Sequence, residues 1–197
     1  MFSIKEEKEI KITIEKSKFY GLCFFCNSVE RQNEILKQVR RKNLNANHVC
    51  FGSLFFENNQ ELCYSSDDGE PSGTAGLQIA NALKENNIVN TLIIVVRYFG
   101  GIKLGVGGLS RAYKDTALKT LEDNTKRVYL KSSCKAICNY STFDYVKKYL
   151  DENKISYTNL EFKKEVSFNC YLKQEEIEFL EKKDVLIKEE NLPKVYC

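Results

Sequence analysis

The stretch TLIIVVRYFGGIKLGVGGLSRAYK, residues 91–114, predicts a strand, a glycine-rich loop and a helix in immediate succession. Within the expected strand at 91–99, residues 92–96 are apolar at consecutive positions, and successive side chains of a strand point to opposite faces of the sheet. A strand that is apolar on both faces belongs in the middle of a sheet that helices cover on at least one side. Residues 108–123 then predict a helix, because apolar side chains recur there at every fourth position.

The elements before this stretch follow from the same two periodicities. Alternation of apolar and polar residues predicts four strands, the last two joined as a hairpin. These strands lie at 10–15, 17–26, 48–56 and 61–65. Helical spacing predicts helices at 29–43, where Ser28 is placed to cap the first turn, and at 73–86. Residues 1–125 therefore predict an α+β domain built on a mixed sheet with helices.

The periodicity is interrupted near 123–130, which predicts a boundary between this domain and a second one at 128–197. The elements expected beyond the boundary come in the order strand, helix, strand, strand, helix, strand. They lie at 128–138, 142–153, 155–163, 165–172, 174–182 and 185–189. This βαββαβ order is typical of the ferredoxin-like fold. Both domains are therefore expected to be α+β.

Glycine and basic residues concentrate where the strand at 91–99 passes into the following helix. The glycines are Gly100, Gly101, Gly105, Gly107 and Gly108, and the basic residues are Arg97, Lys103, Arg111 and Lys114. A strand, a glycine loop and a helix start can together receive an anion on backbone N–H groups. We therefore expect RNA or a protein partner to bind here, although tight turns and close packing could equally require the glycines. The spacing matches neither the Walker A motif nor the dinucleotide fingerprint, and no cofactor is expected.

A second unusual segment, the acidic turn at 67–74, runs into the start of the helix at 73–86. It comprises Asp67, Asp68, Gly69, Glu70, Pro71, Ser72, Gly73 and Thr74. Ser72 or Thr74 is expected to cap the helix, and the carboxylates complement the positive end of the helix dipole. The carboxylates can also pair with the basic residues of the glycine-rich unit, which would hold the two segments together.

The acidic turn alone does not predict an enzyme. Catalysis by carboxylates needs a set of metal ligands, or a nucleophile with a base. His48 is the sole histidine and lies at a strand start, where a structural imidazole is expected. His48 and Cys50 would point the same way on a strand, about 7 Å apart, too far to form a nucleophile pair. We therefore predict no catalytic residue.

Composition places the chain among globular proteins, with 43% hydrophobic and 29% charged residues in a length of 197. The net charge of +3 does not indicate nucleic-acid binding, so any such site must be a local patch. No apolar run reaches the ~20 residues of a membrane span, and the charged start MFSIKEEKEIKI lacks a signal peptide. We therefore expect a cytoplasmic protein with no membrane partner.

The eight cysteines are expected to be free thiols in that compartment. Cys23 and Cys26 form a C-x-x-C, but positions three apart on a strand face opposite sides and cannot share one metal ion. Cys134 and Cys138 would lie on one face but ~13 Å apart. No metal site is therefore predicted.

Two blocks of sequence carry a family resemblance. SDDGEPSGTAG, residues 66–76, followed by VVRYFGGIKLGVGGLSRAY, residues 95–113, resembles the signature of the YigZ/IMPACT family. NANHVCF, residues 45–51, resembles the family's A-T-H-x-C segment, with Asn47 in place of threonine. The helix start TAGLQI lacks the proline that many relatives carry after the glycine.

This resemblance implies a first domain with the fold of domain two of a small-subunit ribosomal protein, and a ferredoxin-like second domain. Domain IV of elongation factor G and small-molecule kinases share the first fold. Eukaryotic members of the family regulate translation initiation by binding a large activator of a stress kinase. We expect a non-enzymatic regulator or binding protein linked to translation, which contacts RNA, the ribosome or a translation-regulatory protein. The alternatives are a protein-interaction module in stress signalling and a phosphoryl-transfer enzyme.

Overall fold

The computed structural model describes residues 1–57, 60–190 and 194–196. The chain divides into two compact units, Met1–Val128 and Tyr129–Cys197. Both combine sheets with helices, so the α+β class is confirmed. Residues 58–59, within the expected hairpin turn, lie outside the described residues.

The first unit is built on a five-stranded sheet in the order β2-β3-β6-β4-β5. The strands are β2 (Lys8–Ile14), β3 (Ser17–Phe25), β4 (His48–Glu57), β5 (Gln60–Ser66) and β6 (Thr91–Tyr98). The apolar strand β6 lies in the middle, as predicted. Every pairing in this sheet is antiparallel, so the expectation of a mixed sheet was wrong. The reason is that β3 and β4 run in the same direction, but β6 lies between them and is antiparallel to both.

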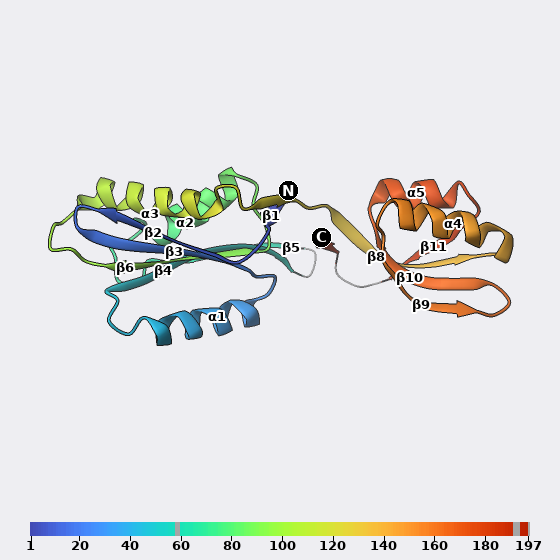
Figure 1. Ribbon diagram of the computed structural model, residues 1–197, viewed down its shortest axis with the longest axis horizontal. Coiled ribbons are helices and arrows are strands. Elements are labelled where there is room, and N and C mark those ends of the chain that lie inside the picture. Colours follow the sequence, from blue (N-terminus) through green and yellow to red (C-terminus); the bar gives the residue numbers. More distant parts are fainter. Residues whose placement is uncertain (58–59, 191–193, 197) are drawn as a thin grey trace. The chain divides into compact units, whose positions relative to one another are not determined.

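Helices cover both faces of this sheet (Figure 1). Helix α1 (Val29–Lys42) lies on one face, and α2 (Gly76–Glu85) and α3 (Gly105–Leu121) lie on the other. Alternate residues of β6 divide between the two cores. Leu92, Ile94 and Val96 belong to the core that includes α1, and Ile93 and Val95 to the core that includes α2 and α3.

Local signals explain how some of these elements begin and close. The Ser28 side chain accepts the N–H of Arg31 and caps α1, as predicted. A two-stranded sheet that was not predicted pairs β1 (Phe2–Ile4) with β7 (Thr125–Arg127). These strands are too short to show a periodicity. They join the first residues of the unit to its last.

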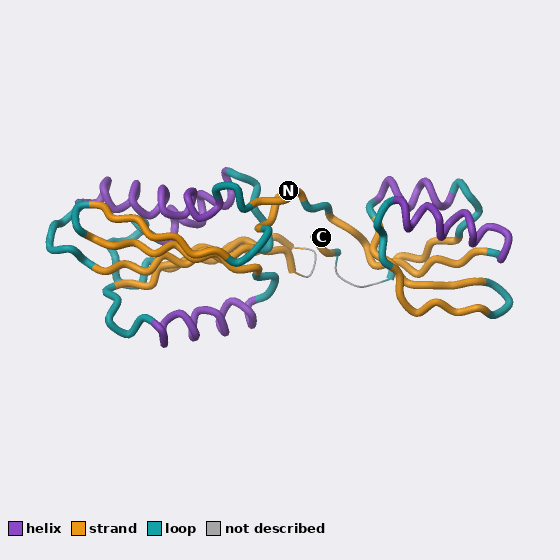
Figure 2. The backbone as a smooth tube through the Cα atoms, viewed as in Figure 1, coloured by secondary structure: helices purple, strands orange, loops and turns teal. Residues whose placement is uncertain are grey.

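The second unit has the predicted βαββαβ order. Its elements are β8 (Leu130–Cys138), α4 (Tyr140–Glu152), β9 (Tyr157–Phe162), β10 (Val166–Leu172), α5 (Gln174–Glu181) and β11 (Leu186–Glu189). The strands pair antiparallel in the order β11-β8-β10-β9, and a short β12 (Val195–Tyr196) also pairs with β8. Figure 2 shows both helices on one face of this sheet. This arrangement confirms the expected ferredoxin-like domain.

The cysteines lie mostly in these cores. Cys23 belongs to the core with α2 and α3, and Cys26 to the core with α1, so they occupy opposite faces of the sheet. Cys134 and Cys138 lie in the core of the second unit. Across residues 1–57, 60–190 and 194–196, histidine, cysteine and carboxylate side chains form no group of three that could hold a metal ion. Within the same residues, no helix has the length and apolarity needed to cross a bilayer.

Candidate functional site

The acidic turn forms a scaffold at the start of α2, and Asp67 is its main acceptor. Asp67 Oδ1 accepts the N–H groups of Ala75 and Gly76 at 2.9 and 2.8 Å, and Oδ2 accepts that of Gly73 at 2.8 Å. Capping by Ser72 or Thr74 was therefore the wrong expectation. The hydroxyl of Thr74 instead donates to the Pro71 carbonyl, and Ser72 is exposed. One carboxylate thus satisfies three N–H groups where the helix leaves its first donors unpaired.

Asp68 connects the turn to two other elements. Its Oδ1 accepts Nη2 of Arg40, on α1, at 2.9 Å, and its Oδ2 accepts the N–H of Val49, on β4, at 2.7 Å. The backbone passes through positive φ at Asp68 (43°) and Gly69 (86°). The positive φ at position 69 favours glycine, whereas a Cβ there would make only an ordinary contact with the His48 ring, at 3.6 Å.

Glu70 is buried and joins the turn to β6 and α3. Its Oε1 forms an ion pair with Nη1 of Arg97 and accepts the hydroxyl of Tyr113 at 2.8 Å. Burial, and then the neighbouring Cys50 and Glu70, raise the pKa of the Tyr113 phenol far above its usual value. The phenol therefore stays protonated and acts as a donor. A buried charged pair with an additional hydrogen bond holds the three elements together.

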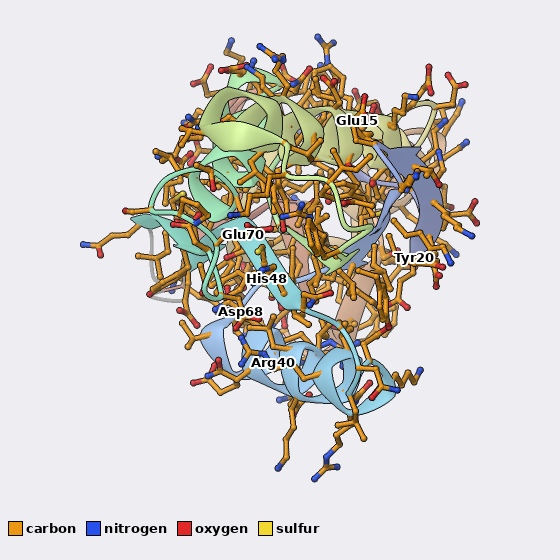
Figure 3. All side chains as sticks on the ribbon, turned by 90° about the vertical axis from the view of Figure 1, so that its left-hand side faces the viewer. Glu15, Tyr20, Arg40, His48, Asp68 and Glu70 are labelled. Carbon is orange, nitrogen blue, oxygen red and sulfur yellow. The ribbon has the colours of Figure 1, made fainter. Side chains whose placement is uncertain are left out.

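His48 lies between Asp68 and Glu70. Figure 3 shows the three residues in succession between α3 and α1, with Arg40 reaching up from α1. His48 Nδ1 is 2.9 Å from the carbonyl oxygen of Asp68, and Nε2 is 3.8 Å from Glu70 Oε1. A carbonyl oxygen can only accept, so Nδ1 carries a proton. With the proton on Nδ1, Nε2 is an acceptor in the neutral form of the ring.

Cys50 is a buried thiol with its own acceptor. Its Sγ donates to the Asp67 carbonyl at 2.9 Å and lies 3.5 Å from the Tyr113 hydroxyl. Burial raises the pKa of the Cys50 thiol to about 12. A thiol with such a pKa is a poor nucleophile, because the thiolate is the reactive form. The chemistry around His48 is therefore that of hydrogen bonding.

These side chains border a pocket of about 460 Å³, which we call the His48 pocket. Its lining consists of Asn47, His48, Glu70, Pro71, Arg97, Phe99, Lys103, Leu104, Gly105, Val106 and Leu109. The polar groups come from β4 and the residue before it, from the acidic turn, from β6 and, in Lys103, from the loop at 99–104. The apolar groups come mainly from that loop and from the start of α3. This pocket could not be predicted from local sequence patterns, because its residues are up to 62 positions apart (47 to 109). One signal was present: an arginine at the end of an apolar central strand needs a buried counter-charge.

The glycines of the strand–loop–helix unit have different structural roles. Helix α3 begins at Gly105, so Gly105 and Gly107 lie in its first turn and not in the loop where we expected them. Gly108, which we expected to be the first residue of the helix, lies further inside it. Gly101 and Gly105 have positive φ, 89° and 69°. A Cβ on Gly100 would lie 2.0 Å from the carbonyl carbon of Lys16, so the loop passes against the β2–β3 turn.

The four basic residues of the unit divide into two pairs. Arg97 is buried against Glu70, and Lys114 forms an ion pair with Glu85 at 2.7 Å. Lys103 and Arg111 are exposed, and no carboxylate of the described residues is within ion-pair distance of either. The expected pairing between the two segments thus holds for Glu70 and Arg97.

Exposed apolar side chains lie among the two unpaired cations. Phe99, Ile102 and Val106 are exposed, and together with Lys103 and Arg111 they form what we call the loop–helix surface. Lys103 lines both the His48 pocket and a second hollow of about 480 Å³ that Ile102 and Arg111 also line. Glu15 and Asp115 line this second hollow as well. The surface therefore combines cations and apolar groups, and carboxylates share the hollow that adjoins it.

Comparisons with known proteins agree with the resemblance of the motifs. Residues 15–121 match the family model described as the Impact N-terminal domain. The chain is 32% identical over 181 residues to IMPACT family member YvyE of Bacillus subtilis (strain 168), covering 89% of this chain and 81% of that protein. It is 36% identical over 134 residues to an IMPACT family member of Haemophilus influenzae, covering 65% and 63%. A crystal structure of a hypothetical protein aligns over 96% of both chains with 22% identity and a TM-score of 0.65, which shows a shared fold.

Proposed function

Because the chain belongs to the IMPACT family, we propose that it is a non-enzymatic regulator linked to translation. We further propose that it contacts RNA, free or in the ribosome, through the loop–helix surface. The family supports the link to translation, since its eukaryotic members regulate translation initiation. One observation carries the RNA contact: two exposed cations, without an ion-pair partner in the described part of the chain, lie among exposed apolar groups that include an aromatic ring.

The chemistry of this surface suits single-stranded RNA. Lysine and arginine neutralise phosphates and release counterions, and exposed aromatic rings stack on bases of any sequence. Lys103 and Arg111 supply the first property, and Phe99, 45% exposed, supplies the second. Arg97 and Lys114 are already held by carboxylates, so they contribute less to an RNA contact.

The alternative occupant is a protein. Exposed Phe99, Ile102 and Val106 are also the kind of side chains found in the cores of protein interfaces. A phosphoryl-transfer activity is less well supported, because Asp67 and Glu70 are occupied by backbone N–H groups and by Arg97 and Tyr113. Salt dependence separates RNA from protein, since the binding of phosphates weakens steeply with salt.

The double variant Lys103→Gln/Arg111→Gln tests this proposal. We expect weaker binding to single-stranded RNA, because two phosphate contacts are lost. The slope of log K against log salt should shrink by ~1.4, at about 0.7 for each contact. Fluorescence anisotropy with a labelled single-stranded RNA over a series of salt concentrations measures both quantities.

The matched control is Lys37→Gln/Lys119→Gln, which removes the same charge from exposed positions on α1 and α3. The control should bind RNA with nearly the slope of the unmodified protein. Unchanged RNA affinity and slope in a folded Lys103→Gln/Arg111→Gln protein would show that this surface does not bind RNA. Capture of a protein partner with little salt dependence, lost in Val106→Asp, would support the protein alternative instead.

A further inference from the structure

The His48 pocket presents two hydrogen-bond acceptors near each other. The contacts of the Glu70 carboxylate with Arg97 and Tyr113 are both made by Oε1, which leaves Oε2 as an acceptor on a side chain that lines the pocket. His48 donates through Nδ1 to a backbone carbonyl, so Nε2 is also an acceptor when the ring is neutral. Nε2 lies 3.8 Å from Glu70 Oε1. This part of the pocket therefore suits a group with more than one donor.

The charges of the pocket disfavour an anion next to these acceptors. The Arg97 charge is already compensated by its ion pair with Glu70, and a phosphate beside the carboxylate would be repelled. Lys103 is the other cation of the lining, and it is exposed on the loop–helix surface. A fitting ligand thus has a neutral group with donors at the buried end and a negative charge near Lys103. A nucleotide has this distribution of charge.

The remaining lining suits a planar ring. Phe99 is an exposed aromatic residue, and Leu104, Val106 and Leu109 complete an apolar wall. Single-stranded bases bind proteins by stacking on such rings and by hydrogen bonds along their Watson–Crick edges. Guanine is the RNA base with two adjacent donors on that edge, N1–H and the N2 amino group, which a carboxylate and a neighbouring acceptor can receive together.

We propose that the His48 pocket binds one unstacked guanine base, with Glu70 and His48 as acceptors and Phe99 as the stacking surface. This inference rests on the proposed function, in which the rest of an RNA lies on the adjoining loop–helix surface. The pocket supplies a preference for sequence, and Lys103 and Arg111 supply affinity that is independent of sequence.

The first test uses the full-length chain and free nucleotides. His48 is the sole histidine of the 197 residues, so its ring signals in an NMR spectrum are assigned without a variant. We expect guanosine 5′-monophosphate to shift these signals and to bind about tenfold more tightly than the adenosine, cytidine and uridine monophosphates, as for a two-point base contact. Equal affinities, or no shift of the His48 signals, would overturn the proposal.

Two variants separate the roles of the pocket. Glu70→Gln should abolish the preference for guanosine monophosphate, but it also removes the partner of Arg97 and can impair folding. Phe99→Ala affects an exposed residue and should weaken nucleotide binding about tenfold through lost stacking. Phe25→Ala is the matched control, since Phe25 is 46% exposed against 45% for Phe99. Phe25 pairs with Thr91 at the start of β6, whereas Arg97 of the pocket lies near the other end of that strand. An equal loss in both variants would contradict the stacking role.

An oligouridylate and the same oligomer with one guanosine distinguish failure of this inference from failure of the proposed function. If both bind equally, and binding depends on Lys103 and Arg111, the guanine site is wrong and the RNA surface stands. If guanosine monophosphate is preferred but Lys103→Gln/Arg111→Gln leaves the RNA affinity unchanged, the guanine site is supported and the proposed RNA-binding role of the loop–helix surface is contradicted. Tighter binding of the guanosine-containing oligomer, lost in Glu70→Gln while the salt slope is kept, supports both.

Discussion

At the scale of single residues, the first unit is organised around the carboxylates of the acidic turn, and each has a separate task. Asp67 fixes the start of α2, Asp68 fastens the turn to α1 and β4, and Glu70 compensates Arg97. A buried arginine that loses its partner is strongly destabilising, because its charge remains in a medium of low dielectric constant. Glu70 therefore explains how the apolar strand β6 can carry an arginine one residue before its end.

Asp67→Ala tests the capping role. We expect the free energy of unfolding to fall by ~1–3 kcal/mol, because three N–H groups at the start of α2 lose their acceptor. Urea denaturation followed by circular dichroism measures this change. Ser72→Ala is the control and should change stability by less than ~0.5 kcal/mol, since Ser72 is exposed and caps nothing. A larger loss in Ser72→Ala than in Asp67→Ala would contradict the assignment.

The sequence located this turn but not its contacts. Turn residues and a following helix are visible as local patterns, so residues 67–74 could be placed correctly. Which side chain caps the helix depends on how the turn folds back, and Asp67 reaches a helix start eight and nine residues further along the chain. The sequence indicated that carboxylates of the turn can pair with basic residues of the glycine-rich unit, but not which ones. Glu70 and Arg97 are 27 positions apart, and the order of strands in the whole sheet decides which distant residues meet.

At the scale of elements, the passage from β6 to α3 determines what the site presents. The loop at 99–104 is held against the β2–β3 turn by close contact at Gly100. The Ser17 hydroxyl accepts the N–H of Gly100 at 3.1 Å. Because α3 already begins at Gly105, the exposed residues Val106 and Arg111 both lie on the helix, which fixes the spacing of their backbone positions.

Gly100→Ala and Gly107→Ala should therefore have opposite effects. The methyl group at position 100 would meet the backbone of Lys16 and Ser17, and we expect a loss of ~2 kcal/mol or more. At position 107, the nearest atom outside the local helix backbone is the end of the Arg111 side chain, 3.9 Å away. Alanine there should stabilise α3 by ~0.5–1 kcal/mol, because glycine is a poor helix former.

Thermal and urea denaturation of both variants measure these changes. A destabilised Gly107→Ala protein would mean that position 107 belongs to a loop with glycine-specific geometry, as the sequence alone suggested.

The early start of α3 could not be predicted, because three glycines within four positions carry a low helix propensity. Packing of Leu109 and Tyr113 in the core overrides that propensity. Long periodic segments, by contrast, gave the other helices within a few residues.

At the scale of the whole molecule, buried thiols in both units are expected to lower the free energy of unfolding at alkaline pH. Burial raises the pKa of Cys26 and Cys134 to about 11, and that of Cys50 and Cys170 to about 12, from 9.0. The folded state keeps these protons, and the unfolded chain releases them above pH 9. The stabilisation is therefore complete below pH 9 and is lost as the pH rises from 9 towards 11–12.

We expect the free energy of unfolding to fall by ~1 kcal/mol for each such thiol between pH 8 and pH 10. Urea denaturation at several alkaline pH values measures the slope. Cys170→Ala should reduce the slope for the second unit, and Cys63→Ala should leave it unchanged, since Cys63 is exposed. Equal slopes for the unmodified protein and Cys170→Ala would contradict the assignment.

The order of strands in the first unit has a consequence for how the chain is made. Hairpins β2–β3 and β4–β5 form no backbone hydrogen bonds with each other, because β6 lies between β3 and β4 in the sheet. Strand β6 comes some 25 residues after β5 in the sequence. A nascent chain that ends before residue 91 therefore has two hairpins with unsatisfied edges and no central strand. The β1–β7 pairing closes only when residues 125–127 have emerged. Such dominance of non-local contacts makes co-translational folding of this unit late and concerted, so premature termination anywhere before β6 leaves a product prone to aggregate.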